Sequence, residues 1–123
     1  MAEQQQEVRR APGTTTIAPG VLVRIAQLAA LSIPGVFGIA PIPGGVNRLF
    51  RRGSSDGVRV EVEDNRVSTD LFLILNYGVD ARKVSREVQR AVARAIEDMV
   101  GMQVERIDAH IEDIDFERPN GET

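Results

Sequence analysis

The sequence predicts an α+β fold in which two helices pack on one face of a small sheet, as a two-layer sandwich. Apolar residues recur at helical spacing in two segments and alternate with polar residues in three others. These segments follow one another in the order helix, strand, strand, helix, strand, which favours helices segregated on one side of the sheet. The length of 123 residues suits one domain with a single modest core.

The first helix is expected over residues 19–32. Pro19 suits a first helical position, and Pro34 followed by Gly35 ends the helix. Its apolar face is expected to comprise four residues at helical spacing, namely Val21, Ile25, Leu28 and Ala29. Residues 1–16 are polar and read as a disordered arm, residues 17–117 as the domain, and residues 118–123 as a disordered tail.

Residues 34–57 are expected to form a long loop rich in proline and glycine. Seven large apolar residues lie within it: Val36, Phe37, Ile39, Ile42, Val46, Leu49 and Phe50. A simple flexible linker would not hold so many apolar groups, so part of this loop should pack against the domain.

Two strands follow the loop. The first covers 58–63, where valines alternate with charged residues, and the turn residues Asp64 and Asn65 lead into the second. In the second strand the odd positions from Val67 onward face the core, which places Phe72 and Ile74 on the opposite sheet face. These two apolar residues need a cover, which is either the 36–50 loop or another protein.

The second helix is expected from 81 to about 100, with Asp80 as its N-cap and Gly101 as its stop. Its apolar face comprises Val84, Val88, Ala91, Val92, Ala95 and Met99. The last strand alternates through Ile107, Ala109 and Ile111, after a change of parity near its start. We expect it to pair beside the 58–63 strand, giving a three-stranded sheet.

Composition narrows the possible functions. The net charge of −3 argues against a general nucleic-acid binder, and the absence of cysteine excludes disulfides and thiolate metal sites. No secretory signal and no run of about 20 apolar residues is present, so we expect a soluble, cytoplasmic protein whose membrane contact is peripheral or through a partner.

Five short motifs stand in a characteristic order along the chain. They are Ile33-Pro34-Gly35-Val36, the strand opening Gly57-Val58, the junction Asn76-Tyr77-Gly78-Val79, the helix end from Met99 to Val104, and the pattern Val104, Ile107, Ala109, Ile111. In this order, from about Thr16 to Phe116, the sequence resembles the alkaline shock protein family of bacterial envelope stress response proteins. The long segment after the first helix departs from the usual pattern of that family.

The resemblance implies a non-enzymatic cytoplasmic protein associated with cell-envelope homeostasis, gathered near the membrane through a membrane-anchored partner. It brings no catalytic residues and no cofactor. The residues agree, because there is one histidine, no cysteine, and no nucleophile with a base beside it in the pattern.

Asp108, His110 and Glu112 alternate along the last strand and would project from one face, which makes them a weak candidate for a divalent metal site. The same three positions are where solvent-facing polar residues belong, opposite Ile107, Ala109 and Ile111. We therefore expect a charged sheet face rather than a metal centre.

Four arginines at i, i+4 steps form a basic band on the second helix: Arg82, Arg86, Arg90 and Arg94. The last strand and its continuation are acidic. This layout is that of ordinary solvated faces, or it allows the basic band of one copy to meet an acidic face of another copy or a partner. Homo-oligomers are then expected, and a head-to-tail contact can propagate. A nucleic-acid-binding module using the basic band is the alternative function.

A last candidate contact lies in the loop, where Arg48, Arg51 and Arg52 surround Leu49 and Phe50. Three cations and two apolar groups give weak lipid anchoring at best, because each basic residue near an anionic surface contributes roughly 1 kcal/mol. Docking of a partner on this segment, or plain packing, is the preferred interpretation, and Phe72 with Ile74 is the best-placed candidate interface in the chain.

Overall fold

The computed structural model describes residues 12–43, 54–55 and 57–117. Along these ranges the chain forms α2 (Pro19–Leu31), β1 (Val36–Ile39), β2 (Ser54–Ser55), β3 (Val58–Glu63), β4 (Arg66–Asn76), α3 (Ala81–Val100) and β5 (Gln103–Asp115). The expected tail, most of the expected arm, and residues 44–53 and 56 of the expected loop lie outside the described residues.

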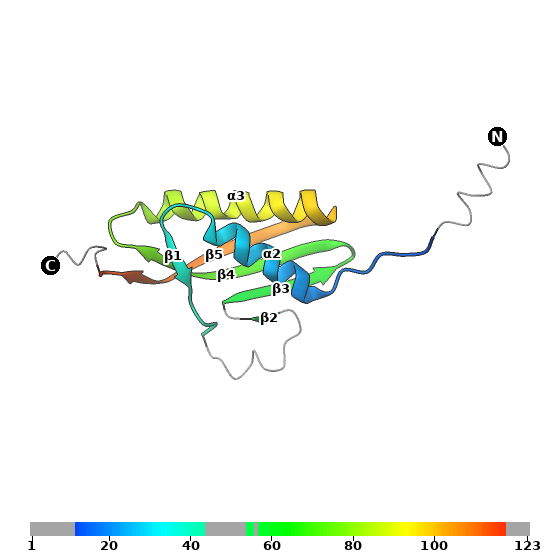
Figure 1. The fold of residues 1–123 in the computed structure, drawn as a ribbon, viewed down its shortest axis with the longest axis horizontal. Helices are drawn as coiled ribbons and strands as arrows, with labels where there is room; N and C mark the ends of the chain where they lie inside the picture. Colours follow the sequence, from blue (N-terminus) through cyan, green and yellow to red (C-terminus); the bar gives the residue numbers. More distant parts are fainter. Residues whose placement is uncertain (1–11, 44–53, 56, 118–123) are drawn as a thin grey trace.

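Strand β4 is the centre of the sheet. β5 runs parallel to it along one edge, over residues 66–76. The other edge is shared, because β3 pairs antiparallel with residues 66–71 and β1 pairs antiparallel with residues 73–75. With β2 beside β3, the described residues form a five-stranded mixed sheet. Figure 1 shows α2 and α3 lying together on one face of that sheet.

The α+β class and the placement of both expected helices on one face are confirmed, whereas the three-stranded sheet is wrong in two respects. The last strand does not pair beside the 58–63 strand but lies against β4. The chain leaves β4, passes through α3 and returns to the nearest free edge, which is that of β4 itself. The edge of β3 that faces away from β4 is taken by β2.

The second difference is that both β1 and β2 fall inside the expected 34–57 loop. β1 has only four residues, its Gly38 is a poor strand former, and a register irregularity separates Val36 from Gly38. No alternation is visible over so short a stretch. The expectation that part of this loop packs on the domain is nevertheless confirmed, because Val36 and Ile39 pack against the core.

Local chemistry explains the element boundaries. Asp64 and Asn65 both have positive φ, 54° and 64°, the conformation that a two-residue hairpin turn requires. The Asp80 side chain accepts a hydrogen bond from the Lys83 backbone N–H at 3.2 Å, which caps α3. Gly101 ends α3 in the left-handed region at φ 70°. The turn, the cap and the stop are all at the expected positions.

The core lies between the sheet and the helices. Leu71, Leu73 and Leu75 of β4 are fully buried there, as expected. The helical faces were predicted less well. On α2 the buried residues are Leu22, Val23, Ile25, Ala26 and Ala30.

Val21 and Leu28, which the prediction placed on the buried face of α2, are 45% and 62% exposed. The helix contacts both the sheet and α3, so its buried face is broad and rotated from the simple stripe. On α3 the buried residues are Val84, Val88, Val92 and Ile96, whereas Met99 points outward.

The two strands that share an edge of β4 meet at Phe72. The Phe72 N–H donates to the Gly57 carbonyl at 2.9 Å, and the Phe72 carbonyl accepts from the Ala40 N–H at 2.8 Å. Gly57 has φ +85°, and a Cβ on it would collide with the Ala40 carbonyl oxygen. The junction therefore needs a glycine for two reasons, backbone conformation and space.

We expect Gly57→Ala to lower the free energy of unfolding by about 3 kcal/mol, because a methyl group would force the two strands apart. Gly78→Ala is the matched control, because Gly78 also has positive φ (+91°) but no heavy atom within 4 Å of its added Cβ. Its cost should be about 1 kcal/mol. Urea denaturation of both variants measures the difference, and equal costs would show that the junction is not tight.

Among the described residues, one polar side chain is buried in the core. Thr69 is fully buried on β4, and its Oγ1 has no hydrogen-bond partner among the described residues. A buried hydroxyl without a partner costs free energy that a methyl group does not.

Thr69→Val should therefore raise the free energy of unfolding by about 1 kcal/mol, since valine has nearly the same shape. Thermal denaturation followed by circular dichroism would report it as an increase in Tm. A decrease would mean that the hydroxyl is satisfied, for example by an internal water molecule.

Candidate interaction surfaces

The basic band of α3 is present as a surface. Arg82, Arg86, Arg90 and Arg94 are all exposed, on the side of the helix away from its buried valines. None of the four forms an ion pair with another described residue. Four neighbouring cations without an ion-pair partner among the described residues raise the local positive potential, although the whole chain is acidic.

The acidic counterpart is the end of β5 and the residues after it. Glu112, Asp113 and Glu117 are exposed, Asp115 is half-buried, and none of them is ion-paired within the described ranges. Asp113 and Asp115 instead accept hydrogen bonds from nearby backbone N–H groups. The start of β5 differs, because Glu105 and Asp108 lie 3.6 and 3.1 Å from Arg66 and Arg106. On β5, the negative charge without an ion-pair partner among the described residues is therefore at the C-terminal end of the strand.

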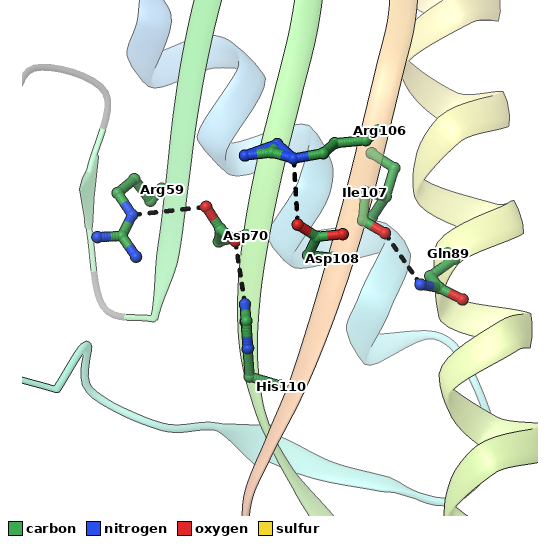
Figure 2. A network of polar contacts seen from close by, with 7 residues as sticks. All are labelled: Arg59, Asp70, Gln89, Arg106, Ile107, Asp108 and His110. Atoms are coloured by element: carbon green, nitrogen blue, oxygen red, sulfur yellow. Dashed lines mark hydrogen bonds and ion pairs between the residues drawn. The ribbon is translucent and has the colours of Figure 1, made fainter.

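The outer sheet face, away from the helices, holds an aromatic and ionic cluster. Asp70 on β4 lies between Arg59, at 3.6 Å, and His110, whose Nε2 donates to Asp70 Oδ1 at 3.0 Å (Figure 2). The His110 ring stacks on Phe72 with centroids 4.6 Å apart and planes inclined by 13°. The Arg59 guanidinium lies 5.5 Å from the centre of the same phenyl ring.

The contacts of Phe72 also show what covers the outer-face patch of Phe72 and Ile74. Phe72 is only 5% exposed, because Ala40 and Ile42 from the segment after β1 pack on it together with Ile74. The first of the two expected covers is thus present, at least up to residue 43. Phe72 offers little surface to another protein while that segment is in place.

The weak metal candidate is not assembled. His110 is engaged with Asp70, and Asp108 pairs with Arg106. The β5 register is irregular after Ile111, where Asp113 rather than Glu112 takes the next position opposite β4. Within the described residues, no group of three His, Asp or Glu side chains could hold a metal ion.

The remaining candidates are not all visible. Arg48, Phe50, Arg51 and Arg52 lie outside the described residues. Arg59, Asp70 and Gln89 are prominent in the structure but were not singled out from the sequence. Asp70 meets His110 only because β5 pairs with β4, and no local pattern indicates this register.

Neither α2 nor α3 is long and apolar enough to cross a membrane.

Fold and surface together define a small α+β protein whose distinctive chemistry is separated surface charge around a closed aliphatic core. The chain belongs to the alkaline shock protein family, which has a cell envelope-related function and whose sequence model matches residues 7–116. The resemblance drawn from the five short motifs is thereby confirmed.

Relatives occur in Bacillus subtilis and Streptococcus pyogenes. The chain is 29% identical to uncharacterized protein YqhY of Bacillus subtilis over 107 residues, covering 85% of this chain and 79% of the relative. It is 26% identical to YloU of the same organism, covering 92% and 98%. With Spy1535 of Streptococcus pyogenes the identity is 30%, covering 86% and 82%. Among solved structures, a MamM-CTD variant has a TM-score of 0.48 at 15% identity, covering 76% of this chain and 94% of that one.

We expect Phe72→Ala to lower the free energy of unfolding by about 3 kcal/mol, because a buried phenyl ring and its contacts with His110 are lost. Phe37→Ala is the control, since Phe37 is 55% exposed and should change stability by about 0.5 kcal/mol or less. Chemical denaturation measures both. Equal small effects would mean that the segment after β1 leaves the patch open in solution.

Proposed function

We propose that this protein is a non-enzymatic interaction protein of the cell envelope stress response, acting through protein–protein contacts near the cytoplasmic face of the membrane. Membership of the alkaline shock protein family supports the link to the envelope. The choice of protein contacts over catalysis is supported by the described surface, where the ionisable clusters are ion pairs and charge bands.

The observation that carries the proposal is charge left uncompensated in two separate places. The basic band lies on α3, and the acidic group lies at the end of β5 (Figure 1). These two surfaces differ, so a contact between them can join copies head to tail, and a head-to-tail contact extends into a ring or a filament.

The strength of such a contact can be bounded. An exposed ion pair contributes roughly 0.2–1 kcal/mol, so contacts of Arg90 and Arg94 with Asp113 and Asp115 give a weak, salt-sensitive association. Several copies held by a membrane-anchored partner would be at a high effective concentration, which strengthens weak contacts without new interactions. The proposed assembly therefore depends on gathering at the membrane.

Self-association should be detectable by sedimentation velocity at high protein concentration. We expect oligomers in about 20 mM salt and monomers in about 500 mM salt, because the Debye length shortens severalfold over this range. Arg90→Glu with Arg94→Glu should abolish assembly, and so should Asp113→Lys with Asp115→Lys.

Mixing the two double variants provides the decisive control. In each variant alone the two surfaces carry charge of one sign, whereas between the two variants both the native pair and the reversed pair of surfaces are complementary, so the mixture should regain salt-sensitive assembly. A wild-type monomer at both salt concentrations would contradict self-association, and a mixture that stays monomeric would contradict the assigned pair of surfaces.

A further inference from the structure

A groove runs between α3 and the edge of β5. Its floor is formed by Ala109 and Ile111, and its wall by Arg82, Ser85 and Arg86 of α3. The three wall residues share one side of the helix, because positions separated by three or four residues lie above one another. Basic and apolar groups therefore line opposite parts of one groove.

The floor of the groove is part of a sheet edge. β4 occupies one side of β5, and no described strand lies on the other. One backbone group on the open side is already satisfied, since Gln89 Nε2 donates to the Ile107 carbonyl at 2.9 Å (Figure 2).

At Ala109 and Ile111, no other described residue is hydrogen-bonded to the backbone groups on this open side. Backbone groups of residues two apart in a strand point to the same side, so Ala109 and Ile111 present theirs to the edge on which Ile107 meets Gln89. Consistent with this assignment, the Asp115 carbonyl, on the far side of the irregularity after Ile111, accepts from the Tyr77 N–H next to β4.

Burial is incomplete at the same place. Ile111 pairs with the fully buried Leu73 and shares its sheet face, yet it remains 37% exposed. Ile107, which lies four residues earlier on β5 and on the same sheet face, is only 8% exposed. α3 thus covers the strand near Gln89 and leaves the floor of the groove uncovered.

The charge on the wall indicates what could fill the groove. Arg82 and Arg86 are exposed and form no ion pair with another described residue, although the chain carries a net charge of −3. A chain lying along Ala109 and Ile111 would direct alternate side chains toward α3. Carboxylates at those positions would meet the two guanidinium groups, which bind carboxylates well.

We propose that this groove binds an extended acidic segment of a partner protein, added as a short strand to β5 at Ala109 and Ile111 with its carboxylates on Arg82 and Arg86. Main-chain hydrogen bonds supply affinity in this mode of recognition, and alternate side chains supply specificity. The inference rests on the proposed function, in which the protein acts through protein contacts, but it uses a different part of α3 from the Arg90 and Arg94 tested above.

The probe is a capped hexapeptide of alternating aspartate and valine, titrated into the ¹⁵N-labelled full chain and followed by NMR. We expect saturable shifts at the Ala109 and Ile111 amides. Arg82→Glu with Arg86→Glu should weaken binding at least about tenfold, as the loss of two charge-assisted contacts implies. Arg90→Glu with Arg94→Glu is the matched control on the same helix and should change the Kd less than about twofold.

A second peptide separates strand addition from simple charge attraction. Methylation of its backbone nitrogens keeps every carboxylate but removes the hydrogen-bond donors, so this peptide should not bind. Equal binding of both peptides, or shifts that avoid Ala109 and Ile111, would overturn the proposal. Sedimentation in the presence of the first peptide completes the test. If the peptide displaces self-assembled copies, a second copy is the occupant of the groove and a separate partner is contradicted. Unchanged assembly supports a separate partner protein. A peptide that fails to bind while assembly persists refutes this inference alone.

Discussion

The backbone of Phe72 is the point on which the sheet depends. One edge of β4 serves two different strands, and they meet where the Phe72 N–H bonds to Gly57 and the Phe72 carbonyl bonds to Ala40. This arrangement lets a short strand from the loop continue the line of β3 without a gap in the hydrogen bonding. It also delivers Ala40 and Ile42 to the outer face, where they cover the phenyl ring. The pairing of β1 with the edge of β4 thus also covers Phe72 on the outer sheet face.

Features with a strong local signal could be predicted from the sequence. Asp80 and Gly101 bound α3 by capping chemistry, and the leucines of β4 alternate clearly enough to assign their face. The basic band could also be predicted, since a helix converts spacing directly into a surface. For α2 this reasoning failed, because apolar residues surround most of the helix and spacing alone does not select the buried side.

Features that depend on distant pairing could not be predicted. Asp70 and His110 are 40 residues apart in sequence, and they meet only because β5 returns to β4 rather than to β3. The groove beside Ala109 depends on the same choice, since pairing beside β3 would have placed β5 at another position in the sheet. β1 was missed because four residues with a glycine among them carry no periodic signal. Sequence reasoning thus identified the charged surfaces but not the edge next to them.

The Gln89 side chain has a further consequence for the self-association proposed above. A long bare strand edge can template the pairing of other chains without limit, and proteins at high local concentration are the most exposed to this hazard. By occupying the Ile107 carbonyl, Gln89 interrupts the edge of β5 after a short open stretch. A high local concentration can then favour specific association without starting amyloid-like growth, because a single amide side chain shortens the strand edge on which further chains could pair.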